Sequence, residues 1–335
     1  MCILCRSSKK KSITYINRSI IHLQFCKYIK NIPIKLTNIT VFNCSYSSLI
    51  DLYNLNHYNL KHLICNNTHI TNVNYYIPNL IELNISNTKI KNLPNCLYNL
   101  KYLNISNTLI TRLPLNITKV ELLNADFSKL LFIPKNLIYL QKLFIINTLI
   151  KVIPEFLINL IYLDCSYSLI TDIPSTLINL KAINCNNTNI KYISDTFINL
   201  EYLICNNTQV SSISNKFCNL KELNIFNCPI NYIPNNFNNL YKLLIYNRLL
   251  FNKLVIKKYI TINFLIYHFK TKFKYIRKFK HITINNLYKY IDLISDNYLH
   301  PNSLALYYKV LHFDLVQNKL IYLNSNNKLI IYKLV

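Results

Sequence analysis

The sequence contains no glycine among its 335 residues. Average usage would be about 7%, and several kinds of site depend on glycine because a residue without a side chain lets the backbone approach a phosphate closely. Glycine-rich phosphate loops, dinucleotide-binding fingerprints and glycine-flanked nucleophile elbows are therefore excluded. Tight turns must instead use asparagine, which tolerates a left-handed backbone.

Acidic residues are scarce as well, since 13 Asp and Glu face 38 Lys and Arg, for a net charge of +25. Such a surplus suggests nucleic acid or an anionic membrane as a partner. However, the sequence is also rich in Ile, Asn and Tyr and has no Trp. This composition is typical of an AT-rich coding genome, such as that of an amoebal giant virus or an AT-rich protist. The lysine surplus can then reflect codon supply.

Long apolar runs are absent too, so no membrane span is expected. The opening MCILC is too short for the apolar region of a secretory signal and is followed by RSSKKK. We therefore expect a cytoplasmic protein, located in the host cytoplasm if it is viral. Five of the 11 cysteines stand at positions where the pattern below requires a buried apolar residue, which predicts free thiols in the core. They are Cys44, Cys65, Cys165, Cys185 and Cys205.

The sequence is dominated by a repeat of 20 residues, seen best in LKAINCNNTNIKYISDTFIN and LEYLICNNTQVSSISNKFCN, which follow one another from Leu180. We number each repeat from offset 0 at its first residue. Apolar side chains recur at offsets 0, 3, 5, 10, 13 and 17, Thr or Ser at offset 8, and Pro often at offset 14. Asn recurs at offset 19, where we expect it to make the tight turn before the next repeat.

Offsets 3 and 5 have the period of a β-strand, so both side chains turn to one face and offsets 2, 4 and 6 turn to the other. A single repeat buries too few apolar side chains to fold alone, and its stability must come from stacking on its neighbours. The result is a solenoid with parallel strands. Proline at offset 14 disfavours a helix before that position and leaves room for a short 3₁₀ turn on the outer side.

The pattern L-x-x-L-x-I-x-N-T-x-I, at Leu80, Leu83, Ile85, Asn87, Thr88 and Ile90, resembles the leucine-rich repeat family. The resemblance covers about residues 39–250. It departs from the commonest form of the family at offset 8, where Thr or Ser replaces Asn, and the hydroxyl can still bond neighbouring backbone. The resemblance implies an α/β-type leucine-rich repeat solenoid of about 11 repeats, with a curved parallel sheet and an extended or 3₁₀ convex side.

The resemblance also implies a function, a non-enzymatic scaffold that binds a partner protein on its concave face. A narrower alternative is the substrate-recognition subunit of a ubiquitin ligase, although no F-box segment is evident. Neither a cofactor nor a metal is implied. The residues expected at this partner-binding face are Tyr102, Asn104, Asp126, Lys142, Phe144, Ile146, Tyr162, Asp164, Asn184, Tyr202, Glu222 and Phe226. Among them we expect Phe144, Ile146, Tyr162 and Tyr202 to be anchors, because exposed aromatic and aliphatic groups mark interaction sites.

Residues 1–19 are expected to form a basic arm, and residues 20–38 a degenerate first repeat with Ile20, Leu23, Phe25 and Ile32 turned inward. Two other interpretations stay open for this end. Palmitoylation of Cys2 and Cys5 beside the basic run would anchor the arm to a membrane. Alternatively, Cys2, Cys5, His22 and Cys26 have the approximate spacing of a zinc site.

After Leu250 the period is lost, and residues 251–335 are expected to form a mixed α+β cap rich in basic and aromatic residues. Helices are predicted at 285–299 and 303–316, and a hairpin around NSNN at 324–327. As an alternative to capping, the basic 250–290 segment could bind nucleic acid or an anionic membrane. The candidate residues for an anionic ligand are Lys270, Lys272, Lys274, Arg277, Lys278 and Lys280.

Overall fold

A computed structural model describes residues 19–28, 30–32, 36, 38–53, 55, 58–73, 75–240 and 242–244, together with three strands near the C-terminus. Residues 1–18 of the predicted N-terminal arm, the basic 250–290 segment and the predicted helix at 285–299 lie outside the described residues.

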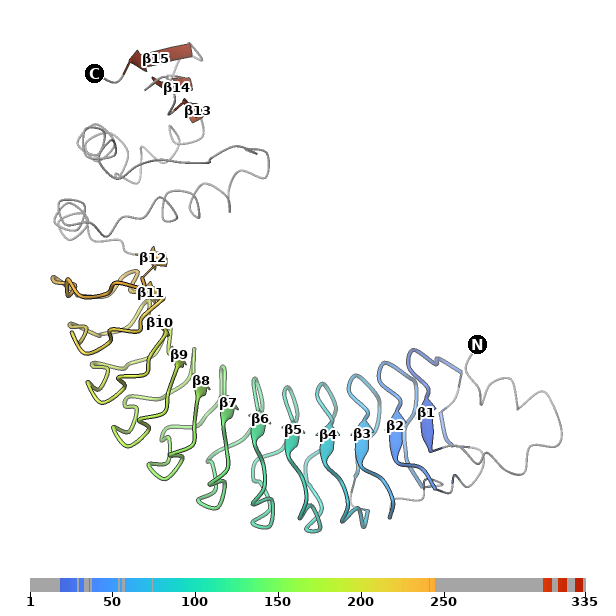
Figure 1. Cartoon of the computed structure of the whole chain (residues 1–335). Coiled ribbons are helices and arrows are strands. Elements are labelled where there is room, and N and C mark those ends of the chain that lie inside the picture. The colour runs from blue at the N-terminus through green and yellow to red at the C-terminus, as the bar shows by residue number, and fades with distance from the viewer. Residues whose placement is uncertain are drawn as a thin grey trace.

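A solenoid of stacked rungs, each made of one short strand and an irregular return, occupies residues 20–244. Its strands form one 12-stranded parallel sheet in sequence order, as Figure 1 shows. The strands are β1 (Ile20–His22), β2 (Val41–Asn43), β3 (His62–Ile64), β4 (Glu82–Asn84), β5 (Tyr102–Asn104), β6 (Leu122–Asn124), β7 (Lys142–Phe144), β8 (Tyr162–Asp164), β9 (Ala182–Asn184), β10 (Tyr202–Ile204), β11 (Glu222–Asn224) and β12 (Lys242–Leu244). The predicted parallel solenoid is confirmed.

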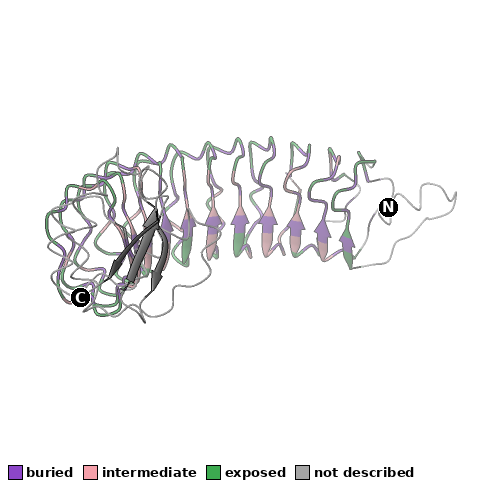
Figure 2. Ribbon diagram, turned by 90° about the horizontal axis from the view of Figure 1, so that it is seen from above, coloured by how far each residue is buried: buried purple, intermediate pink, exposed green. Residues whose placement is uncertain are grey.

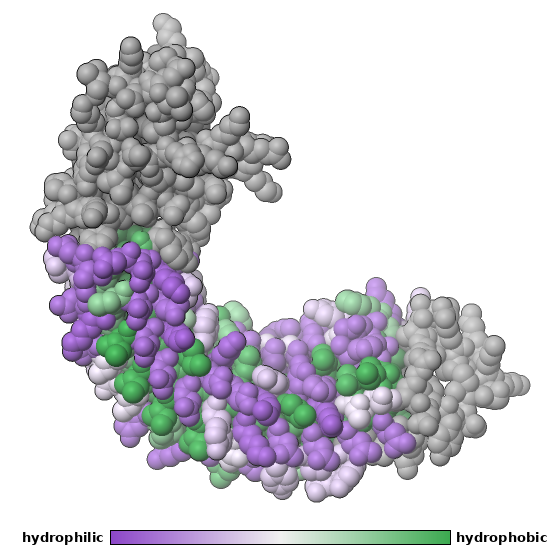
Figure 3. All heavy atoms as spheres, in the orientation of Figure 1, coloured by the Kyte–Doolittle hydropathy of each residue, from purple (hydrophilic) through white to green (hydrophobic). Residues whose placement is uncertain are grey.

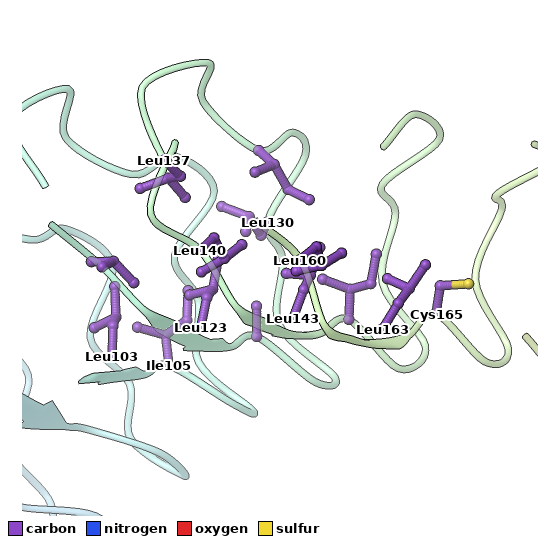
Figure 4. Packing of buried hydrophobic residues seen from close by; sticks show 14 of the residues in the cluster. Leu103, Ile105, Leu123, Leu130, Leu137, Leu140, Leu143, Leu160, Leu163 and Cys165 are labelled. Atoms are coloured by element: carbon purple, nitrogen blue, oxygen red, sulfur yellow. The ribbon is translucent and has the colours of Figure 1, made fainter. Parts of the chain in front are cut away.

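The core is a column of the repeated apolar positions, and it runs without interruption from β1 to β12. In the rung of β7, for example, Leu143 and Ile145 at offsets 3 and 5 are fully buried, as are Leu140 and Leu157. Each side chain packs on its equivalents in the neighbouring rungs (Figure 4). Buried residues therefore recur at the same place along the sheet (Figure 2).

The strands stay in register because each pairs with residues 20 positions away, as Leu143 does with Leu163. The first two steps differ, since Ile21 pairs with Phe42 and Phe42 with Leu63, each 21 positions apart. The returns contain turns and extended backbone and no helix within the described part of the solenoid.

The first rung corrects two of our expectations. Ile21 and Leu23 are the buried side chains, at 2% and 1% exposure, and Ile32 is buried as predicted. Ile20 and Phe25, which we expected inside, are 52% and 66% exposed. Ile21 and Leu23 occupy offsets 3 and 5, two residues earlier than the Leu23 and Phe25 that we assigned there, because the pairing of Ile21 with Phe42 fixes the phase of the strand.

The left-handed turns are also not where we predicted them. Within the described rungs of 20 residues, positive φ values occur at offset 7, as in Asn87 and Asn147, and not at offset 19. Asparagine at offset 19 instead bridges adjacent rungs through its side-chain amide. Asn159 Nδ2 donates to the Ile138 carbonyl at 2.8 Å, and Asn179 repeats the contact with Ile158 at 2.9 Å. Side-chain hydrogen bonding, and not backbone conformation, explains asparagine at that position.

Near the C-terminus, β13 (Val310–Asp314), β14 (Lys319–Leu323) and β15 (Leu329–Lys333) form an antiparallel sheet in that order. The predicted hairpin at 324–327 is confirmed by the pairing of β14 with β15. The predicted helix at 303–316 is wrong over residues 310–314, because this segment pairs with β14 instead.

Candidate functional site

The solvent-facing side of the sheet presents offsets 2 and 4 of every rung, because offset 3 between them is buried. Figure 1 shows the strands on the inner side of the arc, so this side is the concave face. The predicted partner-binding residues lie along it from β5 to β11, and Tyr102, Lys142 and Phe226 are its exposed members. Asp164 is the exception, since only 6% of its surface is exposed.

Many polar residues of the concave face are engaged in local hydrogen bonds. At offset 4, Asn104 Oδ1 accepts from the backbone N–H and the hydroxyl of Ser106, at 3.0 and 2.8 Å. Asn84 makes the same pair of bonds with Ser86. These contacts close the turn that follows the strand, and they explain why Asn recurs at this position.

Three consecutive rungs in the middle of the sheet depart from that arrangement. Asp126 and Ile146 occupy offset 6, where most other rungs have Ser or Asn, and Phe144 and Asp164 occupy offset 4, where most other rungs have Asn. We call these four residues and Tyr162 the central patch. Ile64, Ile204 and Leu244 at offset 4 and Phe226 at offset 6 are further exceptions. The ring centroids of Phe144 and Tyr162 lie 5.0 Å apart, with the planes inclined at 34°.

The two carboxylates of the central patch are held by neutral donors. Asp126 Oδ1 accepts from the backbone N–H of Ile146 at 2.7 Å. Asp164 Oδ1 accepts from the N–H and the hydroxyl of Ser166, and its Oδ2 accepts from Asn184 Nδ2 at 2.9 Å. Because no cation is among these donors, the hydrogen bonds fix the position of each carboxylate without neutralising its charge.

The charges in the central patch influence one another. Burial, together with the nearby charge of Asp164, raises the pKa of the Asp126 carboxyl. Burial also raises the pKa of the Tyr162 hydroxyl, and the charges of Asp164 and Asp126 add to that effect. The central patch is thus a partly dehydrated region of negative charge in a chain with a large positive net charge.

Other acidic residues at the strands have cationic partners from the chain itself. Glu121 and Glu201 each form a salt bridge with a lysine of an adjacent rung, to Lys101 at 2.7 Å and to Lys221 at 2.6 Å. A Glu82 oxygen lies 2.9 Å from His62 Nδ1, a contact that is ionic only when the imidazole is protonated. Within the described residues neither Asp126 nor Asp164 forms a salt bridge.

A groove off the strand face is a feature that our sequence analysis missed. It crosses successive rungs at the prolines of offset 14, has a volume of about 1040 Å³, and is lined by Phe132, Pro154 and Tyr192 among others. A hydrogen bond with the Asp172 carboxylate raises the pKa of the Tyr192 hydroxyl. The sequence signal that could have predicted this groove is the aromatic or aliphatic residue at offset 12, two positions before the prolines. On the face shown in Figure 3, hydrophobic side chains form separate patches among hydrophilic ones.

Solved structures provide the comparison that decides the fold. The leucine-rich effector protein YopM from Yersinia pestis matches with 17% identity and a TM-score of 0.55, over 68% of this chain and 77% of YopM. An octameric complex of Latrophilin 3, Unc5D and the FLRT2 leucine-rich repeats matches with 16% identity and a TM-score of 0.54, over 76% of this chain and 90% of the other.

This chain has the leucine-rich repeat fold. The functional domain of InlJ from Listeria monocytogenes, which includes a cysteine ladder, is also similar, with 19% identity and a TM-score of 0.49. That match covers 62% of this chain and 58% of the InlJ domain. No protein-family model and no curated protein matches the sequence.

The hydroxyl at offset 8 performs the backbone role that we predicted for this leucine-rich repeat variant. Thr108 Oγ1 donates to the Ile105 carbonyl at 2.7 Å, and Thr148 makes the equivalent bond to Ile145 at 3.0 Å. Both threonines are buried. The short hydroxyl therefore satisfies a carbonyl inside the rung.

The cysteines at offset 5 lie in the leucine-rich repeat core, as predicted, and are buried free thiols. Burial raises the pKa of Cys165 and Cys185, which makes them poor nucleophiles. Cys26 is buried as well, whereas His22 is exposed. Cys2 and Cys5 lie outside the described residues, so the zinc and palmitoylation hypotheses stay open.

The described residues contain neither a metal-binding cluster nor a membrane-spanning helix. No group of three or more His, Cys, Asp or Glu side chains in this part of the chain could hold a metal ion. The same part has no helix that is both long and apolar enough to cross a membrane. The six candidate residues for an anionic ligand, Lys270 to Lys280, lie outside the described residues.

Proposed function

We propose that the protein is a recognition scaffold that binds a partner protein on the concave face of its leucine-rich repeat sheet. The observation that supports this most directly is the central patch, where large apolar and aromatic side chains from neighbouring rungs come together in place of the Asn and Ser found in most other rungs. Phe144 and Tyr162 form a rigid aromatic pair of the kind enriched in protein interfaces. The FLRT2 repeats in the similar octameric complex assemble with other proteins, which agrees with this proposal.

The experiment compares two double variants of the full chain in affinity capture with quantitative mass spectrometry. Phe144→Ala with Tyr162→Ala removes the aromatic pair from the concave face. Phe132→Ala with Tyr192→Ala removes a phenylalanine and a tyrosine from the groove off the strand face, and so controls for the loss of exposed aromatic surface. We expect the first variant to lose partner proteins by about tenfold or more, since aromatic anchors contribute 2 kcal/mol or more at interfaces.

The control variant should retain those partners. Loss of the same proteins from the groove variant alone would move recognition to the groove and contradict the concave-face proposal. Binding of nucleic acid or an anionic membrane by the basic 250–290 segment stays a prediction, as does a cytoplasmic location.

A further inference from the structure

The central patch carries two negative charges that the fold does not require. Asp164 accepts the bonds from Ser166 that Asn84 and Asn104 accept from Ser86 and Ser106 in their own rungs. A neutral Asn therefore does the same structural work at this position. Likewise, offset 6 holds an uncharged residue in the other described rungs, such as Ser86 and Ser166, where this rung has Asp126.

These charges are costly where they stand. Asp164 is almost completely buried and has no cationic partner among the described residues, and Asp126 is half-buried near it. Burial disfavours the ionised form of Asp126. Lys142 lies on the same face beside Tyr162 but forms no salt bridge with either aspartate within the described chain. The counter-charge is therefore left for a ligand to supply.

The chain contains an internal example of how a cation binds on this sheet. Lys221 Nζ lies 2.6 Å from Glu201 Oε2 and 5.9 Å from the ring centroid of Tyr202. Carboxylate and aromatic ring thus share one ammonium group, combining charge–charge and cation–π attraction. In the central patch the same two kinds of group are present, with a second carboxylate and a second ring, but no lysine of the described residues is paired with either carboxylate.

From this, we propose that Asp126 and Asp164, flanked by Phe144 and Tyr162, form the receptor for a positively charged side chain, arginine or lysine, on a segment of the partner protein. Arginine fits best, because a planar guanidinium can stack on a ring while it donates to carboxylates. The two negative charges repel phosphate groups, so this part of the sheet selects a basic protein segment over nucleic acid. This inference rests on the proposed function and names the chemistry of the partner.

The test uses a displayed library of random dodecapeptides, selected on the full chain. Peptides that bind should be enriched in arginine or lysine, and replacing that residue by glutamine should abolish most of the binding. The variant Asp126→Asn with Asp164→Asn should weaken the selected peptides by about tenfold per carboxylate, since hydrogen bonds to charged groups contribute about 1.5–3 kcal/mol each. The variant should fold normally because Asn is the residue that other rungs use at offset 4.

A matched control, Glu155→Gln with Asp195→Asn, removes the same charge from two exposed positions at offset 15 and should leave peptide affinity within about twofold of the unaltered chain. The proposal is overturned if the selected peptides lack basic residues, or if both variants bind basic peptides equally. It is also overturned if the two aspartates prove to hold a second copy of the chain, seen as self-association that the Asn variant abolishes.

The two proposals fail in different ways. If the aromatic double variant loses its partners in affinity capture while the Asn variant keeps them, the concave face binds protein but the cation receptor is wrong. If neither variant loses partners, the concave-face proposal itself is wrong.

Discussion

At the scale of the residue, offset 7 shows most clearly what replaces glycine in this chain. Most rungs place Asn there with φ between 51° and 57°, a region in which Asn is tolerated because its short side chain bonds locally. Phe127 and Tyr167 adopt the same conformation with φ of 56°. Bulky residues are disfavoured there, and both positions therefore store a small amount of strain.

This strain leads to a stability prediction. Phe127→Asn should raise the free energy of unfolding by up to about 1 kcal/mol, because Asn pays less for the left-handed conformation and Phe127 is more than half exposed. Urea denaturation followed by circular dichroism would measure the change. The reverse substitution, Asn147→Phe, should destabilise by a similar amount. Equal stability of all three proteins would show that the left-handed position carries no residue preference.

The charge of Asp126 leads to a prediction about pH. Because the folded-state pKa of Asp126 lies above the unfolded value of about 3.9, the folded chain binds the proton more tightly. The stability contributed by this residue is therefore present at low pH and is lost as pH rises through the folded pKa. In Asp126→Asn this loss is absent, so the stability difference between variant and unaltered chain should grow from pH 4 upward and then level off.

Urea denaturation at a series of pH values would measure that difference. The single variant Glu155→Gln removes the same charge from an exposed site and corrects for the general effect on a strongly basic chain. If Asp126→Asn and Glu155→Gln change the free energy of unfolding by the same amount at every pH, burial does not perturb the pKa of the Asp126 carboxyl.

At the scale of the element, the strands were predictable because the same signal is repeated many times. Leu, then one residue, then Ile or Cys places two side chains on one face, and each copy independently fixes the phase. The first rung lacks such a consensus, and we placed its strand two residues too late in the chain. Its true phase depends on pairing with Phe42, a contact with a residue about 20 positions away.

The role of asparagine and the segment before β14 were harder to predict for related reasons. An Asn at offset 19 fits a left-handed turn and an inter-rung hydrogen bond equally well from sequence, and only the position of the Ile138 carbonyl decides between them. Residues 310–314 allow either a helix or a strand until the antiparallel partner at Lys319–Leu323 is in place. Within the central patch, the residues were predicted, but not the burial of Asp164 or the contact between Phe144 and Tyr162.

At the scale of the whole molecule, the equal length of the rungs makes the solenoid a sum of nearly equivalent units. Deleting residues 101–120 removes one complete rung and joins Leu100 to Glu121 in the correct phase. The shortened chain should keep its β-sheet signal in circular dichroism and unfold cooperatively, at a urea concentration modestly below that of the full chain.

A deletion of half a rung, residues 101–110, is the control. It places offset 11 after offset 0, so the apolar positions of one rung no longer meet those of the next, and the chain should lose cooperative unfolding. If both deletions behave alike, the rungs are not the units of stability.

The constant spacing of 20 residues also has a genetic consequence. An in-frame duplication of the DNA that encodes one rung inserts a strand, its return and all the side chains that seal it, without disturbing the segments on either side. The inner surface can therefore be lengthened by copying, after which single base changes at offsets 2, 4 and 6 can give each copy its own binding chemistry. The central patch has the form expected of such divergence, since its framework positions match the other rungs while its outward residues do not.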